Sequence, residues 1–291
     1  MNNDKQVQDL SPSVRISLER IGFKELKRRV KLETPIGLLQ LDLTLDLYIS
    51  ISKDRRGAHL SRTAETALEV LETSFIAKSV EEHLELLARH LLKKHEYAEQ
   101  VEVKATFTYY VEVEYGKLKG TEPVVAEVEI SLDRNGRKRW SVAVTVVGLT
   151  ACPSAQQAIA TLLKREPHEV PTHMQKVLVK GKVSGEEGFV RIERLARALH
   201  KSLSAPAFTL LKRADEAELI LRAISNAKLL EDVVRDSIAN IALEFKDLSL
   251  DTLIEVEAES FESIHPHNLY AYKRVALKEA LEALAFSESQ G

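Results

Sequence analysis

Leu39-Gln40-Leu41-Asp42-Leu43-Thr44-Leu45-Asp46-Leu47-Tyr48-Ile49-Ser50-Ile51 alternates apolar and polar residues without a break. Successive side chains of a β-strand point to opposite faces of a sheet, so this period of two predicts one long strand with one buried face. A polar stretch that contains glycine begins at Lys53 and ends the strand. The core of this chain is therefore expected to be built on a sheet.

The same alternation recurs further along the chain. Strands are predicted over 103–115, 124–132 and 138–147, and the last two are joined by an Asn-Gly pair that favours a hairpin. Apolar residues at helical spacing predict a helix over 62–78 and a second helix behind the capping box of Ser79 and Glu82. The second half repeats this order in compressed form, with strands over 175–183 and 252–262 and helices over 189–203, 215–223, 226–242 and 269–285.

The segregation of strand blocks from helix blocks indicates an α+β fold, with antiparallel sheets and helices packed on one face. Residues 1–30 are polar, and Ser11 and Pro12 would begin a short helix over 11–20 as its N-cap and first residue. We therefore divide the chain into an N-terminal extension, 1–30, and two modules of similar order, 31–150 and 151–291.

The composition excludes several classes of protein. The net charge of −3 argues against bulk attraction to nucleic acid or to an anionic membrane, and no apolar run is long enough to span a bilayer. The N-terminus lacks the pattern of a signal peptide, and a single cysteine in 291 residues cannot form an internal disulfide. We expect a cytoplasmic protein with no nucleic-acid or membrane partner.

That single cysteine, Cys152, follows a predicted strand and enters a turn that contains Pro153. From its surroundings alone it could be an inert buried thiol, a nucleophile or a metal ligand. His173 and His265 also lie in predicted loops, and Glu262 precedes His265 by three residues. Thiolate, imidazole and carboxylate together suit Zn(II) or Fe(II), although the spacings match no general zinc motif.

Two further segments could bind a ligand rather than simply face solvent. The loop 53–62 carries four cationic side chains and His59 ahead of a helix, an arrangement that suits a phosphate. Glu231 lies on a largely apolar helix, which predicts a partly buried carboxylate in need of hydrogen-bond donors. The N1–H and exocyclic amine of a guanine-like base would supply two donors in line.

Six ordered blocks between Asp42 and Tyr272 together resemble the type IB and type IV GTP cyclohydrolases, the bacterial alternative enzyme and its archaeal relative in methanopterin biosynthesis. The resemblance implies the tunnelling fold, with two β-β-α-α-β-β-like modules per chain. It also implies a homotetramer, or dimer of dimers, whose active sites lie at subunit interfaces. The blocks are Arg56-Gly57-Ala58-His59-Leu60-Ser61-Arg62, Cys152-Pro153-Ser154, Pro171-Thr172-His173, Lys212-Arg213-x-Asp215-Glu216, Glu231-Asp232-x-x-Arg235 and Glu262-Ser263-Ile264-His265-Pro266-His267.

The resemblance also implies roles for individual residues. One divalent metal per subunit, Fe(II) before Mn(II) or Zn(II), would be held by Cys152, His173, Glu216 and His265. Glu231 would anchor the guanine of GTP, and the ribose or phosphates would meet Arg56, His59, Ser61 and Arg62. Glu262 would lie close to the metal and the reacting carbon. Glu262 and His59 are then candidate general acid/base groups, and Cys152 is the third catalytic candidate.

The implied reaction is hydrolysis at C8 of GTP with release of formate. The archaeal type would give a 7,8-dihydroneopterin 2′,3′-cyclic phosphate, and the bacterial type dihydroneopterin triphosphate. Ser154 stands where many relatives have a second cysteine, which leaves open a non-catalytic protein that binds a purine or pterin. The related nitrile reductase of the queuosine pathway, with Cys152 as covalent nucleophile and NADPH as reductant, is a further alternative that the histidine and glutamate blocks disfavour.

Overall fold

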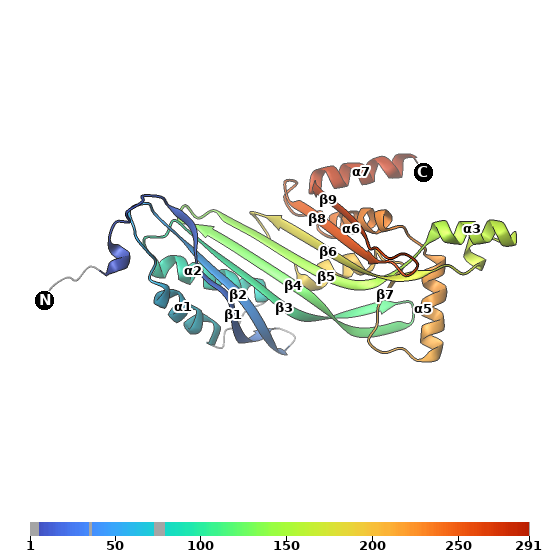
Figure 1. Cartoon of the computed structure of the whole chain (residues 1–291), viewed down its shortest axis with the longest axis horizontal. Coiled ribbons are helices and arrows are strands. Elements are labelled where there is room, and N and C mark those ends of the chain that lie inside the picture. The colour runs from blue at the N-terminus through green and yellow to red at the C-terminus, as the bar shows by residue number, and fades with distance from the viewer. Residues whose placement is uncertain (1–5, 35–36, 73–78, 291) are drawn as a thin grey trace. The chain divides into compact units, whose positions relative to one another are not determined.

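The computed structural model describes residues 6–34, 37–72 and 79–290 (Figure 1). The chain divides into two compact units. Unit 1 comprises Met1–Thr108 and Glu127–Ser141, and unit 2 comprises Tyr109–Ala126 and Val142–Gly291. The division differs from the ranges 31–150 and 151–291 because three long strands contribute residues to both units.

Unit 1 is a sheet with two helices. Its strands follow the order β1-β2-β3-β4-β5, and β1 and β2 pair antiparallel along nearly their whole length. Helices α1 and α2 pack against each other, and α1 also contacts β1. The bounds are β1 (Leu18–Thr34), β2 (Gly37–Ile51), α1 (Leu60–Glu72), α2 (Val80–Lys94), β3 (Gln100–Tyr115), β4 (Leu118–Asp133) and β5 (Lys138–Ala151).

The apolar residues that alternate over 39–51 form the buried face of β2. Leu45 and Leu47 are fully buried, and the residues between the buried positions are more exposed. The predicted N-cap at Ser79 and the hairpin in this unit are confirmed. Ser79 accepts a hydrogen bond from the amide of Glu82 at 3.2 Å, and Gly136 adopts a φ of +83° in the turn between β4 and β5.

The strands of unit 2 follow the order β3-β4-β5-β6-β8-β9, with the two-residue β7 paired to β5. Helix α6 packs on β8 and β9, and α7 packs on α6 and β9 (Figure 1). The bounds are α3 (Pro153–Leu163), β6 (Met174–Gly185), α4 (Ile192–His200), β7 (Ala205–Pro206), α5 (Arg213–Ser225), α6 (Leu230–Glu244), β8 (Leu253–Phe261), β9 (Leu269–Ala276) and α7 (Leu277–Gln290). The predicted α+β class with antiparallel strand pairs is confirmed.

Three local predictions were wrong. The helix over 11–20 does not form, and the chain from Leu18 onward is β1 instead. The helix over 269–285 begins only at Leu277, because 269–276 pair with β8 as β9. The turn at Pro153 is in fact the first residue of helix α3, where proline is tolerated because its missing N–H has no helical partner. The end of the helix predicted over 62–78 lies outside the described residues.

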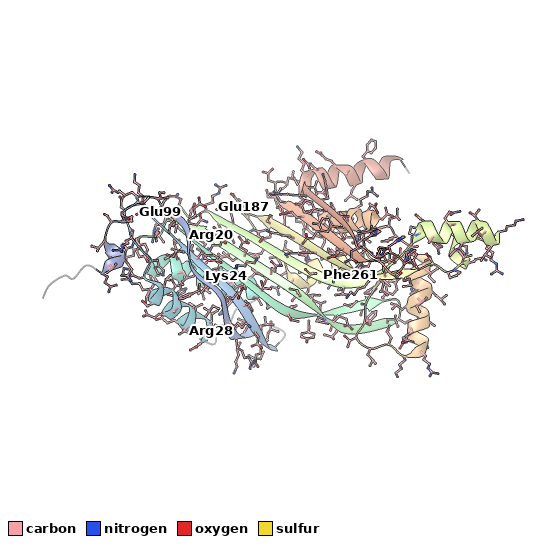
Figure 2. All side chains as sticks on the ribbon, in the orientation of Figure 1. Arg20, Lys24, Arg28, Glu99, Glu187 and Phe261 are labelled. Carbon is pink, nitrogen blue, oxygen red and sulfur yellow. The ribbon has the colours of Figure 1, made fainter. Side chains whose placement is uncertain are left out.

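β1 forms one edge of the sheet in unit 1, and cationic side chains follow it. Arg20, Lys24 and Arg28 lie along the strand (Figure 2). Arg20 pairs with Glu102 of β3 at 2.8 Å. Charged residues on an edge strand disfavour pairing with the edge of another molecule. Within the described part of the chain, no helix is both long and apolar enough to cross a membrane.

Candidate functional site

Cys152 lies in unit 2 at the junction of β5 and α3. It is the N-cap of α3, and its sulfur accepts a hydrogen bond from the amide of Ala155 at 3.4 Å. The thiol is half-buried. A strand end followed by a helix start therefore presents the sulfur beside free backbone amides, which favour a negatively charged group.

The chain around His173 is joined to Cys152 through the backbone. The amide of Cys152 donates to the carbonyl of His173 at 3.2 Å, and the hydroxyl of Thr172 donates to the carbonyl of Cys152 at 2.7 Å. The segment before α6 also reaches this point, because the amide of Lys228 donates to the carbonyl of Ala151 at 3.1 Å. Residues far apart in sequence thus meet at the end of β5.

The loop between β8 and β9 supplies the next contact. Nδ1 of His173 lies 3.3 Å from the hydroxyl of Ser263. The preceding residue, Glu262, accepts a hydrogen bond from the hydroxyl of Ser260 at 2.7 Å. His265 is exposed, and its ring stacks on that of His267 with centroids 5.4 Å apart. The loop therefore contacts His173 through Ser263, next to Glu262, while His265 lies against His267.

Glu216 is exposed in the first turn of α5. The buried side of this helix, at Leu219 and Ala223, belongs to an apolar cluster against which Met174 packs. Because Met174 directly follows His173, α5 lies close to the strand that carries the histidine. The carboxylate of Asp215, next to Glu216, accepts from the amide of Lys212 at 3.2 Å and so has a capping role.

The four residues implied as metal ligands are only partly assembled in one chain. Their donor types fit a divalent transition metal, since thiolate, imidazole and carboxylate all bind Fe(II) and Zn(II). Cys152 and His173 are adjacent through their backbones. Among the residues that the structure describes, however, no group of three or more His, Cys, Asp or Glu is arranged to hold a metal ion. Glu216 and His265 are therefore not gathered with the other two.

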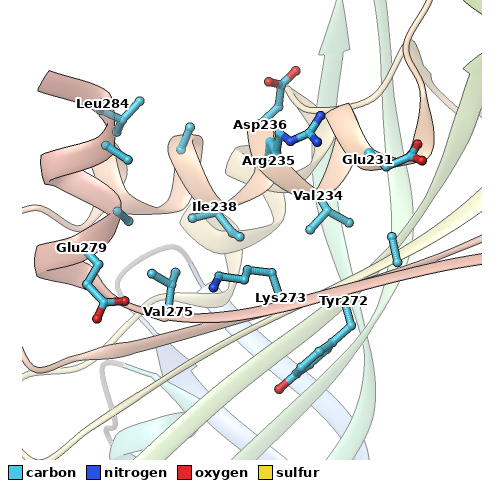
Figure 3. Close-up of a pocket in the computed structure, with 14 residues that line it drawn as sticks. Glu231, Val234, Arg235, Asp236, Ile238, Tyr272, Lys273, Val275, Glu279 and Leu284 are labelled. Atoms are coloured by element: carbon cyan, nitrogen blue, oxygen red, sulfur yellow. The ribbon is translucent and has the colours of Figure 1, made fainter. Parts of the chain in front are cut away.

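Glu231 borders a cavity of about 640 Å³ between α6, β9 and α7 (Figure 3). The prediction that its carboxylate is partly buried was wrong, because it is exposed in the first turn of α6. Mostly apolar side chains line the rest of the cavity, among them Val234, Ile238, Val275 and Leu284. Charged side chains also border it, namely Arg235, Asp236, Lys273 and Glu279. A cavity of this size with apolar walls and some polar groups is typical of small-molecule sites.

The cationic loop lies in unit 1, between β2 and α1. His59 is only 7% exposed, its amide donates to the phenol oxygen of Tyr97 at 2.9 Å, and its Nε2 lies 3.1 Å from a carboxylate oxygen of Asp9. Asp9 also pairs with the guanidinium of Arg55. The hydrogen bond from His59 and the charge of Arg55 lower the pKa of Asp9. The three other predicted residues of this loop, Arg56, Ser61 and Arg62, are exposed.

Two residues of this cluster, Asp9 and Tyr97, were not predicted as members of a site, whereas Arg55 belongs to the predicted cationic loop. Asp9 and Tyr97 come from segments far from that loop in the chain. Asp9 lies in a polar N-terminal stretch with no periodicity, so nothing local marks it as a partner of His59. Arg55 stands beside Arg56 in the same cationic run, and the sequence offers no signal that Arg55 is the one that pairs with Asp9 and stacks on Tyr97.

Comparisons with known proteins agree with the six ordered blocks. A profile of the family described as type I GTP cyclohydrolase folE2 matches residues 5–271. A protein from Aeropyrum pernix named GTP cyclohydrolase MptA is 47% identical over 94% of this chain and 96% of its own length. A protein of the same name from Methanospirillum hungatei is 31% identical over 96% of this chain and 92% of its own.

Solved structures support the fold alone. Uricase from Arthrobacter globiformis superposes with a TM-score of 0.53 at 8% identity, over 89% of this chain and 93% of its own. Urate oxidase from Bacillus sp. TB-90 superposes with a TM-score of 0.54 at 10% identity, over 89% of this chain and 100% of its own. Together with the α+β architecture, these matches confirm the tunnelling fold. The chain belongs to the type I GTP cyclohydrolase folE2 family.

Proposed function

We propose that this protein is a metal-dependent GTP cyclohydrolase that hydrolyses C8 of GTP, releases formate and begins pterin biosynthesis. The observation that carries the proposal is the junction of Cys152, His173 and Ser263, in a chain whose relatives are named GTP cyclohydrolases. We infer the 2′,3′-cyclic phosphate of 7,8-dihydroneopterin as product, with loss of pyrophosphate. Dihydroneopterin triphosphate is the alternative.

The metal would be held by Cys152, His173, Glu216 and His265, with Fe(II) favoured over Mn(II) and Zn(II). When bound, it would supply an acidified water for hydrolysis near neutral pH. The hydrogen bonds that join the backbones at Cys152 and His173 support this assignment, because they hold the two residues side by side. The carboxylate of Glu216 on α5 and the imidazole of His265 in the β8–β9 loop would have to approach Cys152 and His173. A reducing cytoplasm would keep the single thiol available as a ligand.

We assign substrate recognition to Glu231 and to the cationic loop. Glu231, at the edge of the apolar cavity, would accept hydrogen bonds from the N1–H and amine of guanine. The phosphates or ribose would be bound by the cationic loop through Arg56, His59, Ser61 and Arg62. A base that lacks these donors would leave the Glu231 carboxylate without partners, which is the physical source of the selectivity.

Proton transfer is assigned to Glu262 and His59. The Glu262 carboxylate is held by Ser260 and lies one residue from Ser263, which contacts His173. It can therefore accept or deliver a proton near the reacting carbon. The imidazole of His59 lies against Asp9 through one ring nitrogen, and the backbone amide of His59 is held by Tyr97.

A homotetramer with active sites at subunit interfaces is the assembly that we propose. β9 supports it, because within the described residues its outer edge pairs with no strand. Tyr270 and Tyr272 on this strand are 64% and 52% exposed. A second copy could continue the sheet there and bury both rings. Light scattering after gel filtration should give about four times the mass of the 32.7-kDa chain.

The decisive test is anaerobic incubation with GTP and Fe(II), followed by formate measurement and mass analysis of the pterin. Formate together with a cyclic monophosphate supports the proposal in full. Formate with a triphosphate product favours the alternative product. Absence of formate from metal-loaded protein that still binds GTP would favour the non-catalytic purine-binding alternative. NADPH oxidation with a nitrile substrate and no metal requirement would favour the reductase.

A further inference from the structure

The short N-terminal segment Gln8–Leu10 lies on the cationic loop and occupies its backbone donors. The amide of Arg56 donates to the carbonyl of Leu10 at 2.8 Å, and the amide of Gly57 donates to the carbonyl of Gln8 at 3.1 Å. Two consecutive N–H groups of one loop are thus directed at a single short segment. Consecutive backbone amides of this kind are a common cradle for anions.

The side chain in the middle of that segment occupies the cationic groups of the same loop. The Asp9 carboxylate pairs with Arg55 and lies 3.1 Å from Nε2 of His59. The guanidinium of Arg55 stacks 3.7 Å from the centre of the Tyr97 ring, so the cation is fixed in place. Backbone amides, a guanidinium and an imidazole are groups of the kinds that bind phosphates. Residues 8–10 contact the amides of Arg56 and Gly57, the guanidinium of Arg55 and the imidazole of His59.

The Asp9 carboxylate does not satisfy every donor of Arg55, and the segment that carries it buries little apolar surface. Nε of Arg55 is buried without a hydrogen-bond partner among the residues that the structure describes. A phosphate group, with more acceptor oxygens than a carboxylate, could satisfy it. The segment also buries little apolar surface, since Val7 and Leu10 are 57% and 40% exposed. Hydrogen bonds and ion pairs, rather than hydrophobic burial, hold it in place.

We propose that residues Gln8–Leu10 are an internal substitute for the polyphosphate of the substrate, with Asp9 in the place of a phosphate group. The segment leaves the loop when a triphosphate binds. This inference rests on the proposed role of the cationic loop in binding the phosphates. The internal carboxylate must be displaced before polyphosphate binds. The apparent Kd for polyphosphate therefore equals the intrinsic Kd divided by the fraction of molecules in which the loop is free.

The test measures binding of inorganic triphosphate to the full chain by calorimetry, without metal or nucleotide. Asp9→Asn should tighten binding about five- to tenfold, because the competing charge is lost. Asp54→Asn is the matched control. It removes the same charge from the cationic loop itself, at an exposed residue that pairs with Arg15 rather than with Arg55 or His59, and should leave the affinity unchanged. Equal or weaker binding by Asp9→Asn would overturn the proposal and make Asp9 a support of the site.

Hydrogen exchange in the wild-type protein provides an independent measurement. The amides of Asp9 and Leu10 donate to the carbonyls of Gln6 and Val7. Saturation with inorganic triphosphate should accelerate exchange in 6–10, while β2 keeps its protection. If 6–10 stay protected in the saturated protein, the segment does not leave and the inference fails. Neither measurement depends on formate release, so failure of the cyclohydrolase assay would be distinguishable from failure of this inference.

Discussion

The amide of Cys152 lies 3.2 Å from the carbonyl of His173, so a helix start and a strand start that are 21 positions apart are locked together. The bond joins backbone atoms and therefore leaves both side chains available for a ligand. It also means that substitution of either side chain should preserve the junction. Loss of activity in such variants can then be attributed to the missing donor atom.

Replacement of Cys152 by alanine should abolish formate release and lower bound metal. As a proposed direct ligand, Cys152 should matter more for metal affinity than an outer-shell partner, whose removal costs about 10- to 100-fold. Formate assay and metal analysis of the purified protein measure both effects. Ser154→Ala is the matched control, since this exposed residue lies on the same helix start. A Cys152→Ala protein with full metal content and full activity would refute the assignment.

Thr172 should act as a positioning residue for the same junction. Thr172→Val removes the 2.7 Å hydrogen bond to the Cys152 carbonyl with little change of shape. The expected cost is about 1 kcal/mol of unfolding free energy and about a tenfold loss of metal affinity. Thr172→Ser keeps the hydroxyl and should behave as wild type. Unchanged metal binding in the valine variant would show that the hydroxyl does not position the site.

Glu231 should control base selectivity. Glu231→Gln replaces one acceptor with an amide donor, which should raise KM for GTP about 10- to 100-fold with a smaller effect on kcat. Wild type should prefer GTP over inosine triphosphate, which lacks the amine, and the variant should lose much of that preference. Glu279→Gln, on the α7 side of the same cavity, is the control. Retained selectivity in Glu231→Gln would place the guanine elsewhere.

His95 should make the fold sensitive to acid. It is fully buried, with Thr63 and Tyr97 each 3.0 Å from one ring nitrogen. Burial, with repulsion from nearby cations such as Arg62, lowers its pKa to about 4. In the unfolded chain it titrates near 6.5. The unfolded state therefore binds more protons between these values, and stability that is complete above pH 6.5 is lost as the pH falls toward 4.

Urea unfolding between pH 7.5 and 4.5 measures this effect. His95→Gln keeps a hydrogen-bonding side chain but cannot titrate, so its free energy of unfolding should fall less steeply than that of wild type below pH 6.5. His90→Gln, at an exposed position on α2, should keep the wild-type slope. Identical slopes in all three proteins would mean that His95 is not the acid-sensitive group.

The strands with one fully buried face could be predicted from the sequence, because burial imposes a visible period of two. β2 and β3 are the examples. β1 and β9 could not, since both lie at edges of the sheet, where the chain need not alternate. Tyr270 and Tyr272 of β9 are exposed, and the cations of β1 resemble those of a polar loop.

Some residues of the candidate sites could likewise be predicted from the sequence, and others could not. Cys152 and His173 lie in ordered blocks that the resemblance could locate, and the structure brings their backbones together. Asp9 could not be found, because its partners Arg55 and His59 are 46 and 50 positions away and the pairing exists only after folding. The exposure of Glu231 was also unpredictable from sequence, since an apolar helix does not reveal which end leaves the core.

The cationic edge along β1 also restricts the symmetry of any assembly. A twofold axis at Lys24 that set β1 of one molecule antiparallel to β1 of another would place Lys24 opposite its own copy and Arg20 opposite Arg28 of the other molecule, and like charges repel across such a contact. Isologous contact through this edge is therefore disfavoured. Any extension of the sheet at β1 must be heterologous, and the net repulsion also protects the protein against open-ended edge-to-edge stacking into fibrils.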